Sequence, residues 1–206
     1  MARTSRYGEQ WPLITERIQI FRVSESRLNE FERHAKTIIA NKERYIDIER
    51  DTGVPWPLIG VLHLRESSMD FNTYLGNGQP LNMRTTIEPT GRGPFRSFKE
   101  GAIDALRIDA LTAVVQSTDR WDLGRSWGSW PIEKMIHYAE RLNGLGYWYK
   151  GLPSPYVWGG SNVQVRGKYV SDGNFDPNEM DRQPGCAPIL WMIGSLDTSI
   201  NFLRET

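Results

Sequence analysis

The chain has 206 residues, of which 39% are hydrophobic, and this is enough to bury a sizeable core in one globular domain. Its 25 basic and 25 acidic residues give a formal net charge of zero. This balance argues against nucleic acid or an anionic membrane surface as a partner, because both attract clustered positive charge. The single cysteine, Cys186, excludes an internal disulfide framework and a zinc site built from cysteine pairs.

The N-terminal segment has no pattern of an export signal. Two early arginines are followed by Gly8-Glu9-Gln10 rather than by an apolar stretch. No run of about 18 apolar residues occurs, so we expect no membrane-spanning helix. We therefore expect a protein that is made in the cytoplasm without a signal peptide.

Helical patterns dominate the first third of the chain. Between residues 26 and 50, apolar residues recur with the 3.6-residue period of one long amphipathic helix, and Gly53 is expected to end it. Pro55 then begins a second helix, because proline is tolerated in a first turn. Residues 58–62, Leu-Ile-Gly-Val-Leu, are apolar on every side, which predicts that this second helix is buried.

A β-hairpin is expected next. Strand-like runs at 71–75 and 83–87 flank Gly76-Asn77-Gly78-Gln79-Pro80, and Asn-Gly is a frequent hairpin turn. Behind the hairpin, residues 97–100 (Ser-Phe-Lys-Glu) form a capping box, which predicts a helix whose apolar positions continue to Val115.

Two more helices are expected in the second half. Pro131 begins one that ends at Asn143-Gly144, and Pro188 begins the last, with apolar positions continuing to Leu203. Residues 145–187 are rich in Gly, Pro, Tyr, Ser and Asn, and connections of this length usually carry function. The order of elements predicts one α+β domain over 1–206 that is predominantly α, with one small hairpin and residues 1–25 as an extension that packs on it.

The stretch HLRESSMDF, residues 63–71, places Glu66 at the C-terminal end of the apolar helix. Desolvation and the negative end of the helix dipole both disfavour its charge, so the pKa of Glu66 is expected to be raised. A protonated carboxyl group can donate its proton to the leaving oxygen of a glycosidic bond. The alternative is a glutamate that only caps or salt-bridges the helix end. Asp70 is expected to cap the next turn.

Aromatic residues are the main compositional bias. The chain has eight Trp and eight Tyr, and many of them lie near Gly and Pro between residues 121 and 169. Core packing explains most such rings. Tyr and Trp on loops also suit sugars, whose C–H faces stack on aromatic rings.

These features together resemble the lysozyme-like superfamily, in which a general-acid glutamate ends a buried helix and a small hairpin forms one wall of the sugar cleft. Glu66-Ser67 with Phe71 behind it is similar to the first motif of lytic transglycosylases and goose-type lysozymes. More closely, HLRESSMDFNTYLGNGQPL, RLNGLGYW and SPYVWGGSNVQVRGKYVSDG resemble successive blocks of phage and prophage endolysin-type muramidases. These blocks lie between residues 55 and 173, which is more than half of the chain.

The resemblance implies that Glu66 is the general acid and that the loops from Tyr147 to Tyr169 form the side of the cleft opposite the hairpin. By topology, Glu88 is better placed than Asp70 to face Glu66, and Thr85 or Thr86 could position water there. We expect Glu66, Glu88 and Thr86 to be catalytic. The expected substrate-binding residues are Ser67, Tyr74, Gln79, Asn143, Tyr147, Tyr156 and Trp158.

The chain departs from the family pattern in three places. Leu142 replaces the tyrosine of the Tyr-Asn pair that is common in transglycosylases, and Gln79 stands where related sequences often have an acid after the hairpin Asn-Gly. The Gly-Leu-Met-Gln motif of transglycosylases is missing. Hydrolysis and lytic transglycosylation both stay open. The separation of the two carboxyl groups would indicate the stereochemistry of hydrolysis.

The expected function is cleavage of the β-1,4 bond between N-acetylmuramic acid and N-acetylglucosamine in peptidoglycan, by a monomer without metal or cofactor. The resemblance implies a phage lysis protein that waits in the host cytoplasm until the membrane is opened. The alternatives are a non-catalytic peptidoglycan- or chitin-binding module on the same fold and a chitosanase- or chitinase-like hydrolase. Two weaker alternatives are a metal site at His63 and Glu66 with His34 or His137, and Cys186 as a nucleophile.

Overall fold

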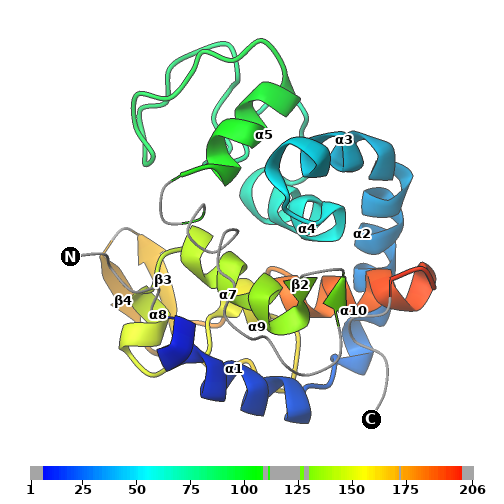
Figure 1. Ribbon diagram of the computed structural model, residues 1–206. Coiled ribbons are helices and arrows are strands. Elements are labelled where there is room, and N and C mark those ends of the chain that lie inside the picture. The colour runs from blue at the N-terminus through cyan, green and yellow to red at the C-terminus, as the bar shows by residue number, and fades with distance from the viewer. Residues whose placement is uncertain (1–6, 109–110, 112–125, 128–129, 172, 201–206) are drawn as a thin grey trace. The chain divides into compact units, whose positions relative to one another are not determined.

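The computed structural model describes residues 7–108, 111, 126–127, 130–171 and 173–200. Helices dominate these residues, and the strands form small two-stranded antiparallel sheets (Figure 1). The prediction of an α+β class that is predominantly α is confirmed. The chain divides into two compact units: unit 1 comprises Met1–Ala35 with Trp121–Thr206, and unit 2 comprises Lys36–Arg120. The single domain over 1–206 stays a prediction.

The single helix expected between residues 26 and 50 is wrong, because three helical segments occupy this range. They are a 3₁₀ turn at Glu25–Arg27, α2 at Leu28–Ala40 and α3 at Lys42–Thr52. The break lies at Asn41, whose side-chain amide donates to the carbonyl oxygen of Thr37 at 2.9 Å. Gly53 ends α3 as expected, with a left-handed φ of 72°.

Helix α4, Trp56–Ser67, begins directly after Pro55 and is the central helix of unit 2. Its residues 56–64 are all buried, which confirms the prediction from the apolar run. In Figure 1, α4 lies beside α3. The approach to the end of α2 is close as well, because a Cβ atom on Gly60 would lie 2.3 Å from Cγ2 of Ile38.

The hairpin is shorter than the sequence predicts. Thr73 and Pro80 form an antiparallel bridge, and the Tyr74 amide donates to the Gln79 carbonyl at 2.7 Å. The expected second strand at 83–87 is wrong, because these residues form bends and loop. Helix α5, Phe98–Leu106, follows. One of the two hydrogen bonds of the expected capping box is present, because the Ser97 hydroxyl accepts from the Glu100 amide at 3.2 Å. Most of the expected continuation to Val115 lies outside the described residues.

The described part of unit 1 contains three longer helices besides the start of α2. They are α1 at Tyr7–Ile20, α7 at Ile132–Leu142 and α10 at Cys186–Leu196. Helix α7 begins after Pro131 and ends at Asn143 as expected, with Gly144 at a φ of 84°. The last helix begins two residues before the expected Pro188 and ends before Ile200. Leu203 lies outside the described residues.

The connection between α7 and α10 is more structured than a loop. It contains the short helices α8 (Gly146–Tyr149) and α9 (Pro155–Trp158) and the strands β3 (Lys168–Ser171) and β4 (Asn174–Asp176). Strands β3 and β4 form an antiparallel pair in which Tyr169 faces Phe175. A second small pair joins β1 (Ser126–Trp127) to β2 (Trp130–Pro131).

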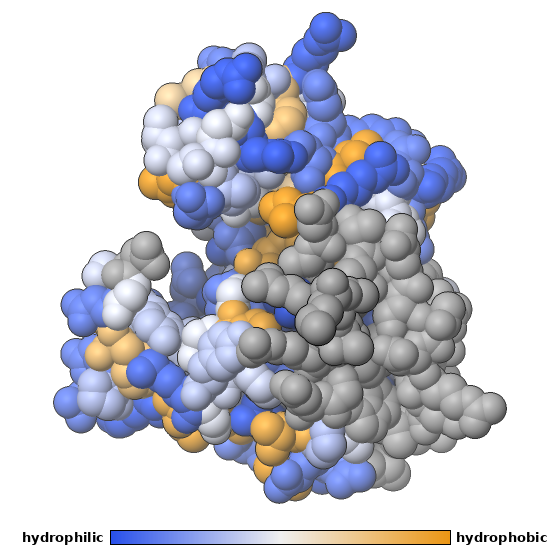
Figure 2. All heavy atoms as spheres, turned by 60° about the vertical axis from the view of Figure 1, so that its left-hand side comes forward, coloured by the Kyte–Doolittle hydropathy of each residue, from blue (hydrophilic) through white to orange (hydrophobic). Residues whose placement is uncertain are grey.

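Exposed hydrophobic side chains are scattered over the described residues. On the face drawn in Figure 2, hydrophobic areas are small and are mostly separated by hydrophilic ones. No described helix has the length and apolar character needed to cross a membrane. Where burial is described, the exposed large hydrophobic side chains are Leu13, Ile20, Met83, Ile87, Tyr149, Val165, Val170 and Leu196.

Candidate active site

Glu66 lies in the last turn of α4, where the chain leaves the helix abruptly. Ser68 and Met69 both have positive φ angles, 51° and 69°, and this left-handed pair turns the backbone away from the helix axis. The amides of Ser68 and Met69 donate to carbonyls of the last turn, and the Ser67 hydroxyl donates to the His63 carbonyl at 3.2 Å. The helix end is thus closed by its own chain, and Glu66 and Ser67 are half-buried there.

The hairpin turn lies directly against Glu66. A Cβ atom on Gly78 would lie 2.7 Å from the backbone oxygen of Glu66, and Gly78 has a φ of 73°. Both features require glycine, because any side chain would collide with the helix end and would strain the backbone. Gly78 therefore fixes the hairpin beside the expected general acid, as the order of elements in the sequence suggested.

Gln79 joins this turn to the loop behind it. Its side-chain oxygen accepts from the amides of Thr86 and Ile87 at 2.8 and 3.2 Å, and its side-chain nitrogen donates to the Thr86 hydroxyl oxygen at 2.9 Å. Asn77 adds a bond to the Ile87 carbonyl at 3.0 Å. The structure therefore brings together two of the expected site residues, Gln79 and Thr86.

The loop that carries Thr86 is closed by the neighbouring Thr85. The Thr85 hydroxyl donates to the Pro89 carbonyl at 2.6 Å and accepts from the Arg92 amide at 2.9 Å, and its side chain is buried. Thr86 and Glu88 are exposed on the same loop. Of the two threonines, Thr86 is therefore the one that solvent can reach.

His63 occupies the buried side of the helix end. Its Nε2 lies 3.1 Å from the Asp70 carbonyl, which can only accept, so Nε2 carries the proton and Nδ1 accepts from the Tyr45 hydroxyl at 2.9 Å. Burial lowers the pKa of His63 to about 4. His63 is therefore neutral at pH 7 and places no positive charge beside Glu66.

This arrangement of His63 also bears on the metal alternative. Both of its ring nitrogens are engaged in hydrogen bonds, so neither is available to a cation without breaking one of them. No group of three or more His, Cys, Asp or Glu side chains suited to a metal ion occurs among the described residues. Cys186, the other weak alternative, is fully buried at the start of α10.

Asp70 caps a turn, as the sequence predicts. Its Oδ1 accepts from the backbone amide and from the side-chain amide of Asn72, both at 2.9 Å. This is an Asx-turn, in which the carboxylate takes the place of a backbone acceptor. Asp70 therefore has a local structural role beside the Glu66 helix end.

Tyr74 is fully buried, and its ring belongs to the core of unit 2. It stacks on Phe95 with ring centroids 5.0 Å apart, and its hydroxyl donates to Oδ2 of Asp104 at 2.8 Å. Arg92 forms an ion pair with the same carboxylate. Tyr74 therefore anchors the hairpin, and the expected sugar contact through its ring is not supported.

The aromatic residues expected to bind sugar in unit 1 are mostly covered. Trp158 is 1% exposed and packs against Phe21, and the Tyr147 hydroxyl accepts from the Tyr169 amide at 3.0 Å. Tyr156 is buried too, so these rings have no open face for stacking. Asn143 is exposed at the end of α7.

One aromatic side chain that the sequence did not single out is open instead. Tyr149, at the end of α8, is 60% exposed, and its ring lies edge to face with Trp148 at 5.1 Å. Its only sequence signal is its place in the aromatic stretch Tyr147-Trp148-Tyr149, which does not say which ring faces solvent.

No family model, curated protein or solved structure matches the chain. A function for this protein is therefore inferred from the residues around Glu66 and from the sequence blocks that carry them. The lysozyme-like resemblance stays a prediction.

Proposed function

We propose that this protein is a peptidoglycan-degrading glycosidase in which Glu66 is the general acid. The observation that carries the proposal is the position of Glu66 in the last turn of a buried apolar helix, with the Gly78 turn directly against it. The bond cleaved is the β-1,4 linkage between N-acetylmuramic acid and N-acetylglucosamine. In a phage setting the protein acts on the cell wall after release from the host cytoplasm.

In the proposed mechanism, the Glu66 carboxyl group holds a proton before the reaction. Partial burial removes water that would stabilise the charged form, and the carbonyl end of α4 disfavours negative charge. The neutral His63 does not oppose these effects with a positive charge. Protonation of the glycosidic oxygen by Glu66 would turn it into a good leaving group.

Thr86 and Glu88 are the proposed partners for the second half of the reaction. The Thr86 oxygen accepts from Gln79, which leaves its own proton for donation to a water molecule. Glu88, two residues further on, would activate that water as a base. In this reaction Ser67 is a polar neighbour of the acid.

Gln79 favours a second candidate, a non-catalytic module that binds peptidoglycan or chitin. All three of its side-chain hydrogen bonds go to Thr86 and Ile87, so the Gln79 side chain has a structural role and supplies no base. If Glu88 does not act as the base, this loop could shape a binding surface without turnover.

Replacement of Glu66 by glutamine distinguishes the two candidates. Glu66→Gln keeps the size of the side chain and removes the titrating proton, so lysis of purified peptidoglycan should fall by at least about 10²-fold with the thermal unfolding midpoint unchanged. The matched control is Asp70→Asn, which makes the same chemical change four residues away and keeps the Asx-turn acceptor. Near-wild-type lysis by Glu66→Gln would reject the mechanism, and no lysis by the wild type would favour the binding module.

The products separate the two catalytic routes. Mass spectrometry of digested peptidoglycan would show water-added reducing ends after hydrolysis and anhydro-muramic ends after transglycosylation. Glu88→Gln should reduce hydrolysis by about 10²-fold if Glu88 is the base. An unchanged rate with anhydro ends would assign the second step to the substrate's own hydroxyl group.

A further inference from the structure

Unit 1 contains a polar cavity that none of the expected site residues lines. It has a volume of about 350 Å³ and is formed by the 3₁₀ turn before α2, the loop after α9 and the segment before α10. This volume falls within the range of small-ligand sites. The lining residues are Ser24, Arg27, Glu30, Gly160, Ser161, Gln164, Met180, Asp181 and Arg182.

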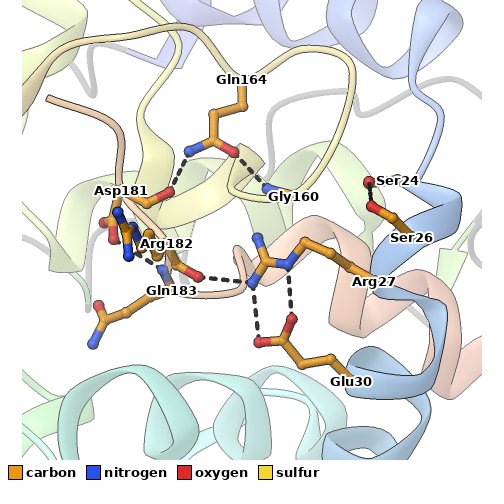
Figure 3. A network of polar contacts seen from close by, with 9 residues as sticks. All are labelled: Ser24, Ser26, Arg27, Glu30, Gly160, Gln164, Asp181, Arg182 and Gln183. Carbon is orange, nitrogen blue, oxygen red and sulfur yellow. Dashed lines mark hydrogen bonds and ion pairs between the residues drawn. The ribbon is translucent and has the colours of Figure 1, made fainter. Parts of the chain in front are cut away.

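The walls of this cavity are linked to one another by side chains, as Figure 3 shows. Gln164 accepts from the Gly160 amide and donates to the Asp181 carbonyl, each at 2.7 Å. Arg27 donates to the Arg182 carbonyl at 2.8 Å. Because each wall is tied to another, the cavity is preformed, and a ligand would not bear the entropic cost of ordering these loops.

Gly160 allows the closest approach between two of these walls. Its φ is 83°, and a Cβ atom there would lie 2.6 Å from the Phe31 ring and 2.8 Å from Nη1 of Arg27. The absent side chain keeps the loop after α9 against the start of α2. The Gly160 carbonyl in turn accepts from the Ser24 amide at 2.9 Å.

The charges that line the cavity are largely compensated by ion pairs, one within the lining and one with Lys168 outside it. Arg27 binds both oxygens of Glu30, at 2.7 and 3.0 Å, and this hydrogen bond lowers the pKa of Glu30. Lys168 lies 3.4 Å from Asp181. The exposed guanidinium of Arg182 has no ion-pair partner among the described residues. The lining therefore offers the paired guanidinium and carboxylate of Arg27 and Glu30, together with one uncompensated positive charge on Arg182.

These groups match a sugar better than a simple anion. A sugar hydroxyl both donates and accepts hydrogen bonds, and the cavity supplies both functions through serine hydroxyls, a carboxamide, carboxylates and a guanidinium. A phosphate or sulfate can carry two negative charges, whereas the lining offers one uncompensated positive charge, that of Arg182. The single remaining positive charge of Arg182 suits one carboxylate on an otherwise uncharged ligand.

We propose that this cavity binds an acylated saccharide that carries one carboxylate, namely a muramyl residue of the glycan strand. The choice of this sugar rests on the proposed function, whereas the saccharide class rests on the lining groups. The sugar hydroxyls contact the Arg27, Glu30 and Gln164 side, and the carboxylate contacts Arg182. The cavity is thus a second point of attachment to the glycan, and its residues lie in other parts of the sequence than the proposed catalytic residues 66–88.

The test uses the full chain with Glu66→Gln, so that ligands are not consumed. Two disaccharides are titrated, N-acetylglucosaminyl-N-acetylmuramic acid and N,N′-diacetylchitobiose, which differ by the carboxylate-bearing group. Backbone amide NMR shifts should move at Gly160, Ser161 and Asp181 with both ligands. The muramyl disaccharide should bind about 2–5-fold more tightly, and Arg182→Gln should abolish this difference.

A matched pair of substitutions then tests the cavity itself. The Ser24 and Ser26 hydroxyls are hydrogen-bonded to each other at 3.0 Å, so Ser24→Phe and Ser26→Phe each lose that bond, but only Ser24 lines the cavity. Ser24→Phe should weaken binding by about tenfold or more, whereas Ser26→Phe should stay within about twofold of the parent. Equal effects of the two variants would overturn the cavity assignment.

The outcomes also separate this site from the proposed catalytic function. Shifts confined to residues 66–88, with wild-type lysis intact, would overturn the cavity and leave the proposed function standing. Shifts at Gly160 and Asp181 in a protein whose lysis survives Glu66→Gln would keep the cavity and reject the general acid. No shift anywhere at millimolar disaccharide would overturn the cavity proposal.

Discussion

The central helices of the two units, α4 and α7, are both buried but have different compositions. Residues 56–64 of α4 are apolar except for His63. Residues 132–140 of α7 are equally buried, yet they include Glu133, Lys134, His137 and Glu140. Hydropathy therefore predicts the burial of α4 correctly, whereas the alternation of polar and apolar residues in α7 is that of a surface helix.

The buried polar groups of α7 are accommodated by losing their charge or by finding a partner. His137 shares a hydrogen bond with Gln10 of α1, and burial lowers its pKa to about 3. Burial raises the pKa of Glu140 to about 8, although Arg17 acts in the opposite direction. Both side chains are therefore uncharged at pH 7, which avoids the cost of an unpaired buried charge. Lys134 lies 4.5 Å from the ring centroid of Trp130.

The largest expected effect on stability concerns Glu140. Its pKa is about 8 in the folded state and 4.5 when unperturbed, so the unfolded state releases this proton first as the pH rises. The free energy of unfolding should then fall between about pH 4.5 and pH 8, by on the order of a few kcal/mol. Thermal unfolding followed from pH 5 to pH 9 would measure this slope.

Glu140→Gln removes that slope. The amide keeps the size and polarity of the neutral acid, so the variant should match the wild type near pH 5 and exceed it at pH 8. Asp176→Asn, on the half-buried strand β4, is the control and should leave the slope unchanged. A wild-type slope in the Glu140→Gln protein would show that Glu140 does not titrate in this range.

His63 in α4 is expected to give a smaller effect, on the acidic side. Its pKa is about 4 in the folded state against an ordinary value of 6.5, so its contribution is present above about pH 6.5 and is lost as the pH falls toward 4. His63→Leu should remove this acid-induced loss. It should also cost about 1–2 kcal/mol at pH 7, because the Tyr45 hydroxyl loses its nitrogen acceptor and keeps only the sulfur of Met69. The Asp70 carbonyl still accepts from the amide and the hydroxyl of Thr73.

Tyr45→Phe separates the two effects expected of His63→Leu, which are the changed stability at acid pH and the loss of hydrogen bonds at pH 7. It removes the donor to His63 Nδ1 and a weaker 3.7 Å contact with the sulfur of Met69, so the free energy of unfolding should fall by about 1 kcal/mol. The loss of stability at acid pH should persist. Chemical denaturation of both variants at pH 5 and pH 7 would measure the difference. An acid-induced loss that survives His63→Leu would assign it to another group.

The elements that were predicted correctly are those whose sequence signals lie within a few residues of the element itself. The start of α4, the Asn77-Gly78 turn and the Ser97 cap depend on neighbours in the chain, and the structure shows all three. The break at Asn41 was missed because the apolar period continues across it, from Ile38 to Tyr45. The strand expected at 83–87 is absent because the Gln79 side chain bonds this segment in place of a backbone ladder.

In the candidate site, too, the features that could be predicted are those that depend on nearby residues in the chain. The position of Glu66 at a buried helix end follows from the run that precedes it, and its neighbour Gly78 follows from the hairpin turn. Which aromatic ring is open does not follow, because Trp158 and Tyr149 lie in similar loop-rich sequence but are 1% and 60% exposed. That difference depends on packing partners distant in the chain, such as Phe21 for Trp158.

The last expected effect on stability tests whether α4 is held by close packing. A Cβ atom on Gly60 would lie 2.3 Å from Cγ2 of Ile38 and 3.3 Å from the Tyr45 ring. Gly60→Ala should therefore cost about 1–2 kcal/mol, because overpacking outweighs the gain in helix propensity. Urea denaturation at pH 7 would measure this change in the free energy of unfolding.

Gly194→Ala in α10 is the matched control for this last change, since it makes the same substitution in another buried helix. There the nearest atom to an added Cβ is the Ile200 carbonyl oxygen at 3.4 Å, an ordinary contact. Gly194→Ala should be neutral or should stabilise by up to about 1 kcal/mol, because only the propensity gain remains. If Gly60→Ala were equally stabilising, Ile38 would have room to move, and the apolar helix that carries Glu66 would be packed less tightly than its composition implies.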